Sequence, residues 1–115
     1  MHEFPLTTSI NNAVLRLCDN FGWDKVRRIL IKVGGMRKIN PELMSCIFAI
    51  VSRGTATEGA DLSIMCLPFT LRCKKCGRKS SREDLDLKCP LCGSTEIEII
   101  SGLELSIEAL EVEKK

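Results

Sequence analysis

Two pairs of cysteines are the residues with the clearest chemistry. Cys73 and Cys76 form one Cys-x-x-Cys pair, and Cys89 and Cys92 form a second one after twelve intervening residues. Four thiolates at this spacing can converge on one tetrahedral zinc ion. A glycine follows each pair, and glycine lets the backbone fold back so that amide N–H groups point at the sulfurs. The spacing therefore predicts a closed, structural zinc site.

The segments around the cysteines indicate what holds them. Residues 79–88 are polar and have no helical apolar stripe, whereas residues 69–71 and 96–99 alternate like short strands. This pattern is typical of a zinc ribbon, expected over residues 69–100. Because the ribbon has few apolar residues, we expect it to need its metal to fold.

Other uses of paired cysteines fit less well. Redox chemistry uses a single Cys-x-x-Cys at the start of a helix in a βαβ setting, and neither pair has that setting. No secretory signal opens the chain, and no apolar run is long enough to span a membrane. We therefore expect a cytoplasmic protein with reduced thiols and no membrane contact.

Charge disfavours nucleic-acid binding. The net charge is only +2. Residues 72–88 contain seven basic and three acidic side chains, a balance of +4, of which a zinc tetrathiolate would neutralise roughly half. The chain has no tyrosine for base stacking, and its only tryptophan lies far from the ribbon in sequence. A nucleic-acid-binding or docking ribbon is kept as the alternative function.

The only histidine is residue 2, in the opening Met1-His2-Glu3. The α-amine of Met1, the deprotonated amide nitrogen of His2 and its imidazole can close two fused chelate rings around Ni(II) or Cu(II). Glu3 could add its backbone nitrogen or a carboxylate oxygen. A terminal histidine is more often a solvated residue on a frayed end, so the residues alone leave both interpretations open.

Helical and strand patterns describe the elements before the ribbon. Thr7 or Thr8 can cap a first helix that ends at Gly22, and residues 25–33 alternate as a strand before a break at Gly34-Gly35. Asn40 and Pro41 are typical of the start of a second helix. The apolar stripes predicted for the two helices are Ile10, Val14, Leu17, Cys18 and Phe21, and Met44, Ile47, Phe48 and Val51.

Two further strands complete the pattern. One follows Gly59, with Leu62, Ile64 and Cys66 on one face. The other begins at Leu103 and shifts its alternation at Leu110, which indicates a bulge. The predicted fold class is α+β: a small three-stranded sheet with two helices on one face, plus an inserted zinc-ribbon domain. The domains would be 1–68 with 101–115, and 69–100. Cys18, Cys46 and Cys66 are expected in or near the core and not as metal ligands.

Several segments together resemble one family over essentially the whole chain. They are Met1-His2-Glu3-Phe4, Gly54-Thr55 with residues 58–62, the two Cys-x-x-Cys-Gly knuckles, and residues 99–105 running on to 111–113. In this order they resemble the HypA family of hydrogenase and urease nickel-incorporation metallochaperones.

The resemblance implies a nickel-binding α/β domain and a separate structural zinc domain. It assigns transported nickel to His2, with Met1 and Glu3 as accessory groups, and structural zinc to the four paired cysteines. It also implies a partner nickel-handling GTPase, delivery to the large subunit of a nickel-iron hydrogenase, and a connection to urease maturation factors.

This chain departs from the family pattern in three places. Pro5 stands where a small polar residue is usual, Gly34-Gly35-Met36 stands where Gly-Glu-Leu is usual, and no second histidine exists. An enzyme is not expected, because there is no nucleophile with a partner base and no glycine-rich phosphate loop.

Overall fold

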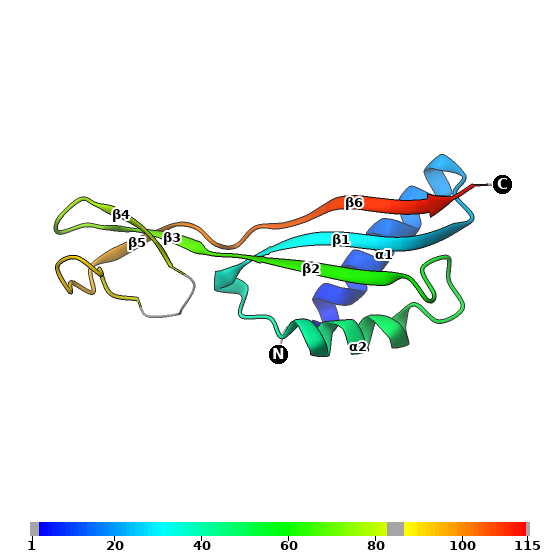
Figure 1. The fold of residues 1–115 in the computed structure, drawn as a ribbon, viewed down its shortest axis with the longest axis horizontal. Helices are drawn as coiled ribbons and strands as arrows, with labels where there is room; N and C mark the ends of the chain where they lie inside the picture. Colours follow the sequence, from blue (N-terminus) through cyan, green and yellow to red (C-terminus); the bar gives the residue numbers. More distant parts are fainter. Residues whose placement is uncertain (1–2, 83–86, 115) are drawn as a thin grey trace. The chain divides into compact units, whose positions relative to one another are not determined.

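The computed structural model describes residues 3–82 and 87–114. Two helices and six strands follow one another in the predicted order of helix, strand, helix, strand, ribbon and strand (Figure 1). The elements are α1 (Glu3–Phe21), β1 (Lys25–Gly34), the 3-10 turn η1 (Gly35–Arg37), α2 (Pro41–Val51), β2 (Asp61–Leu67), β3 (Phe69–Cys73), β4 (Lys79–Arg82), β5 (Ile97–Ser101) and β6 (Leu105–Glu113).

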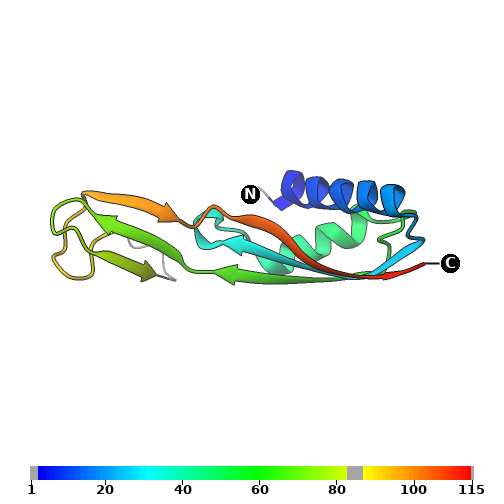
Figure 2. The ribbon, with the colours of Figure 1, turned by 90° about the horizontal axis from the view of Figure 1, so that it is seen from above.

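Three long strands form one sheet in the order β2-β1-β6. The arrows of β1 and β2 point the same way, and both helices lie on one side of the sheet (Figure 2). β6 runs antiparallel to β1, since the Asp24 N–H donates to the Glu113 carbonyl and the Gly34 N–H donates to that of Glu104. The predicted fold class is confirmed.

The backbone divides into two compact units. Unit 1 comprises Met1–Ile31, Ile39–Ile64 and Ile107–Lys115, and unit 2 comprises Lys32–Lys38 and Met65–Ser106. The ribbon lies in unit 2. The division into a nickel-binding domain and a zinc domain with boundaries at residues 69 and 100 stays a prediction.

Helix α1 begins earlier than expected. The hydroxyls of Thr7 and Thr8 donate to the carbonyls of Glu3 and Phe4, over 2.5 Å and 2.9 Å, one helical turn back. A threonine bonded in this way lies inside a helix, so the prediction that Thr7 or Thr8 caps the helix was wrong. The predicted end is confirmed, because Gly22 adopts a φ of +69° directly after Phe21.

Phe21, predicted on the apolar stripe of α1, is 58% exposed, so that prediction was wrong. The predicted core positions of the other elements are largely confirmed. Ile29, Ile31 and Val33 of β1 are at most 1% exposed, and Met44 and Phe48 are the buried residues of α2. Asn40 caps α2, because its side chain accepts a hydrogen bond from the Leu43 N–H. Strand β6 shows the predicted shift, since its half-buried residues are Leu105, Ile107, Leu110 and Val112.

The three cysteines outside the ribbon differ in burial. Cys18 is buried, and burial raises the pKa of its thiol. Cys46 and Cys66 are exposed, so the prediction that they lie in or near the core was wrong. Cys46 lies off the Met44–Phe48 face of an almost entirely apolar helix, and Cys66 lies on β2 at the edge of the sheet. In a helix that is apolar on nearly every side, and in a strand at the edge of a sheet, the apolar pattern of the sequence does not identify the buried side.

A buried hydrogen bond ties the loop after α2 to α1. The Thr57 hydroxyl donates to the Asn11 side-chain carbonyl, and both residues are at most 3% exposed. We expect Thr57→Val to lower the free energy of unfolding by about 2 kcal/mol, because the Asn11 carbonyl would lose its donor in a dry environment. Urea denaturation followed by circular dichroism measures this loss. The control Thr8→Val, which removes an exposed hydroxyl, should cost less than about 0.5 kcal/mol.

Candidate metal centre

A second small sheet supports the cysteines. β3 pairs antiparallel with β4 on one side and with β5 on the other. Phe69 and Leu71 of β3 are fully buried and are the main apolar core of the ribbon. β4 was not predicted, because Lys79–Arg82 has no apolar alternation. Only the backbone pairing of Leu71 with Ser80 and of its neighbours makes this segment a strand.

Each cysteine pair lies on a tight turn closed by its glycine. The Gly77 N–H donates to the Cys73 carbonyl and the Gly93 N–H donates to that of Cys89, both over 2.9 Å. The two glycines have φ values of +79° and +74°, in the region that favours glycine. In the first turn the Cys76 N–H points at the Cys73 sulfur, 3.4 Å away. The predicted role of the glycines is confirmed.

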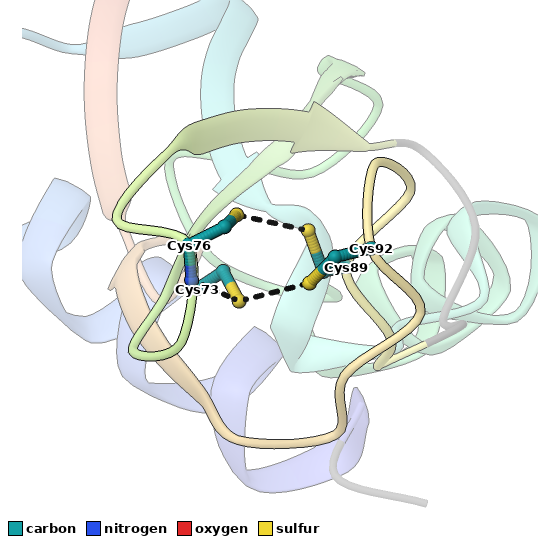
Figure 3. Close-up of side chains that lie close together, drawn as sticks. All are labelled: Cys73, Cys76, Cys89 and Cys92. Carbon is teal, nitrogen blue, oxygen red and sulfur yellow. Dashed lines mark hydrogen bonds between the residues drawn. The ribbon is translucent and has the colours of Figure 1, made fainter.

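The two turns bring the four sulfurs into one cluster (Figure 3). All four lie within 4.8 Å of one another, with Cys73 Sγ 3.5 Å from Cys92 Sγ and Cys76 Sγ 3.7 Å from Cys89 Sγ. These distances are too long for a disulfide, whose sulfurs lie about 2.05 Å apart. Four sulfurs about 2.3 Å from a tetrahedral zinc ion lie about 3.8 Å from one another, so the donor set fits zinc.

Backbone amides favour the thiolate form of the first cysteine in each pair. A hydrogen bond from the Cys76 backbone lowers the pKa of Cys73 to about 6, and one from the Cys92 backbone lowers the pKa of Cys89. At Cys92 the Ser94 backbone lowers the pKa, but the neighbouring cysteines and burial outweigh it and raise the pKa to about 11. Because a metal ion binds the thiolate form of each cysteine, metal binding would release the protons that remain on the cluster.

The residues predicted for nickel are only partly placed. Met1 and His2 lie outside the described residues, as do residues 83–86 of the segment whose charges were counted. Glu3 is described and is 3% exposed; its carboxylate accepts a hydrogen bond from the Asn40 N–H over 3.0 Å. Hydrogen bonding lowers the pKa of Glu3 to about 2, so this side chain is a carboxylate at neutral pH.

Asn40 was predicted as a helix cap but not as the partner of Glu3. The two residues are far apart in the chain, and only the packing of α1 beside α2 brings them together. Through this contact, the residue next to the only histidine is fixed to the first turn of α2.

Neither described helix is long and apolar enough to cross a membrane.

A model of one family matches residues 1–112, and its description is hydrogenase/urease nickel incorporation, metallochaperone, HypA. The chain belongs to the HypA family. As a HypA protein it is a nickel-incorporation metallochaperone of hydrogenase maturation, as the resemblance in the sequence implied.

Relatives from several bacteria match over nearly their whole length. The hydrogenase maturation factor HypA of Acidithiobacillus ferrooxidans is 34% identical, over 98% of this chain and 100% of the relative. That of a Nostoc species is 36% identical, over 99% and 97%. The solution structure of the nickel metallochaperone HypA from Helicobacter pylori has a TM-score of 0.69 over the whole of both chains, at 22% identity, which supports the fold.

Proposed function

We propose that this HypA protein binds transported Ni(II) at Met1-His2-Glu3 and structural zinc at Cys73, Cys76, Cys89 and Cys92. The family match over residues 1–112 carries this proposal, since it includes the Met-His-Glu start and both cysteine pairs. A metallochaperone needs two unlike sites, one closed and one able to release its ion. The cysteine cluster supplies the first, and the terminal chelate supplies the second.

The donor chemistry supports zinc at the cluster. Zinc would cross-link the two turns and add folding free energy to a ribbon with a small apolar core. The chain's own residues prepare the site: backbone amides stabilise the thiolates of Cys73 and Cys89, and the glycines close the turns. Exposed basic residues beside the first turn, Lys74, Lys75 and Arg78, offset the charge of a tetrathiolate.

The contact between Glu3 and Asn40 bears on nickel. Because this carboxylate is held by the first turn of α2, we propose that Glu3 orients the start of the chain and contributes to nickel chiefly through its backbone nitrogen. The amine of Met1 and the amide and imidazole of His2 supply the remaining nitrogens, which suit Ni(II).

The partners follow from the family's role in hydrogenase maturation. We propose that the protein receives or passes nickel with a nickel-handling GTPase and delivers it to the hydrogenase large subunit, with urease maturation factors as further partners. It carries its metal without catalysing a reaction. Its thiolate ligands require a reducing compartment, for which we propose the cytoplasm.

The decisive test is a nickel titration of untagged protein and of His2→Ala, with zinc measured in the same samples. We expect the variant to lose nickel binding at nickel concentrations that saturate the parent protein, because both the imidazole and a chelate ring disappear. Zinc should stay at about one ion per chain. Equal nickel binding by both proteins, or displacement of zinc by nickel, would contradict the proposal and favour a zinc-ribbon docking or nucleic-acid-binding module.

Thr8→Ala is the matched control for this titration. It alters helix α1 in its second turn and removes an exposed hydroxyl, but no proposed ligand. Its nickel and zinc contents should equal those of the parent. A loss of nickel in this control would show that the His2→Ala result reflects a disturbed helix.

A further inference from the structure

A groove runs between α2 and β2. Two neighbouring hollows, of about 310 Å³ and 380 Å³, share Ser45 and Leu62 in their walls and so form one continuous depression. One wall is a face of α2 on which Ser45, Phe48, Ala49 and Ser52 follow at helical spacing. The other wall is β2, with Leu62 and Ile64. We refer to this depression as the α2–β2 groove.

Strand β2 borders the groove and ends its sheet. In the order β2-β1-β6 it has a strand on one side only, so within the described residues its outer edge is unpaired. A strand added to that edge would lie about 4.8 Å from β2. Its alternate side chains would point to the same side as Leu62 and Ile64, into the groove. The groove is therefore where an added strand would bury side chains.

A buried hydroxyl in the groove lacks a partner. Ser52 is fully buried, and its Oγ is the one buried side-chain polar atom without a hydrogen bond among the residues that the structure describes. Such an atom costs free energy until a partner arrives. Ser52 lines the groove, so this unpaired hydroxyl lies directly beneath the groove surface.

The charge of the groove indicates what kind of segment fits. Glu42 lines one hollow and Asp61 the other, and neither lysine nor arginine lines either of them. Neither carboxylate takes part in an ion pair within the described part of the chain. The groove is thus apolar in its walls and acidic at its margins, which is complementary to a segment that is apolar on one face and basic on the other.

We propose that the α2–β2 groove binds an extended segment of a partner protein in which apolar and basic residues alternate. The segment adds a strand to β2, places its apolar side chains between α2 and β2, and pairs a basic side chain with Asp61, which alternates with Leu62 along β2. A second copy of this chain is a poorer occupant. Pairing β2 with its own copy would bring Asp61 and Glu42 of both copies to one interface, with no basic residue in either groove.

The test uses a short capped peptide that alternates lysine and valine, titrated into the full-length zinc-loaded protein. Amide NMR signals report the site, and calorimetry at low and high salt reports the affinity. We expect the signals of β2 and of the groove face of α2 to shift. A peptide that alternates glutamate and valine should not bind. A lysine-valine peptide with methylated backbone nitrogens should bind at least about tenfold more weakly, because it cannot complete the strand pairing.

Matched variants on α2 separate the groove from the rest of the helix. Ala49→Arg places a long cation in the groove and should weaken peptide binding by about tenfold or more. Ile50→Arg is the control, because Ile50 is 58% exposed and lines neither hollow. The affinity of this variant for the peptide should match that of the parent protein. Glu42→Gln combined with Asp61→Asn should weaken binding and reduce its salt dependence. All variants should bind nickel as the parent does.

Three results would overturn the proposal. One is the absence of lysine-valine peptide binding at millimolar concentration. Another is equal binding by the Ala49→Arg and Ile50→Arg variants. The third is concentration-dependent dimerisation of the peptide-free protein in sedimentation experiments with β2 at the interface, which would make a second copy the occupant. None of these results bears on nickel binding at His2.

Discussion

Replacing Cys89 with serine is expected to remove zinc and unfold the ribbon while α1 and α2 stay folded. Cys89 is a buried member of the sulfur cluster, 2% exposed, and backbone hydrogen bonds lower its pKa, which favours the thiolate that a metal ion binds. Apart from the cysteines, the fully buried apolar side chains of this sheet are Phe69 and Leu71, too few to hold it without metal. Structural zinc contributes on the order of 10 kcal/mol in small domains of this kind.

Zinc content per chain and amide NMR spectra measure this effect. The signals of β3, β4 and β5 should collapse to unfolded positions, and those of α1 and α2 should persist. Cys46→Ser is the matched control, because Cys46 is an exposed cysteine outside the cluster, and it should leave both measurements unchanged. A folded ribbon in metal-free Cys89→Ser protein would show that the metal is not structural.

Gly34→Ala is expected to destabilise the protein by about 3 kcal/mol or more. A Cβ on Gly34 would overlap the carbonyl of Gly102 and come within 2.8 Å of the Glu104 nitrogen. These are backbone atoms and cannot turn aside as a side chain can. The Gly34 N–H also donates to the Glu104 carbonyl over 2.7 Å, so moving the strands apart would break this bond.

Urea denaturation of Gly34→Ala and of Gly54→Ala separates crowding from backbone conformation. Gly54 has a φ of +74° with nothing within 4 Å of an added Cβ, so its variant should lose only about 1 kcal/mol. Equal losses in the two variants would contradict the role assigned to the close approach of Gly34 and Gly102.

Much of the fold could be predicted because local patterns and packing agree. Asn40-Pro41 starts α2 and Gly22 follows α1, as capping chemistry requires. The sequence did not predict where α1 begins, because Thr7 and Thr8 are good caps in isolation and only their bonds to the preceding turn place them inside the helix. It also missed β4, whose residues are strand only by pairing with β3.

The cysteine cluster could be predicted from spacing because each pair needs only its own turn, and four thiolates suit one ion. The burial of the remaining cysteines could not be predicted. Cys18, Cys46 and Cys66 all lie in apolar segments, but which side of a segment is covered depends on elements far away in the chain. Met1 and His2, which are predicted to bind nickel, lie outside the described residues, so a nickel site there stays a prediction.

By itself, the sequence determined the grouping of the four cysteines, the order of the elements and the family, because residue type, spacing and periodicity are local properties. The tertiary structure decided which distant groups meet. It joined Glu3 to Asn40, placed Gly34 against Gly102, left β2 at the sheet edge and left the Ser52 hydroxyl unpaired in the α2–β2 groove. These contacts depend on how the helices pack on the sheet, and no short stretch of sequence encodes that packing.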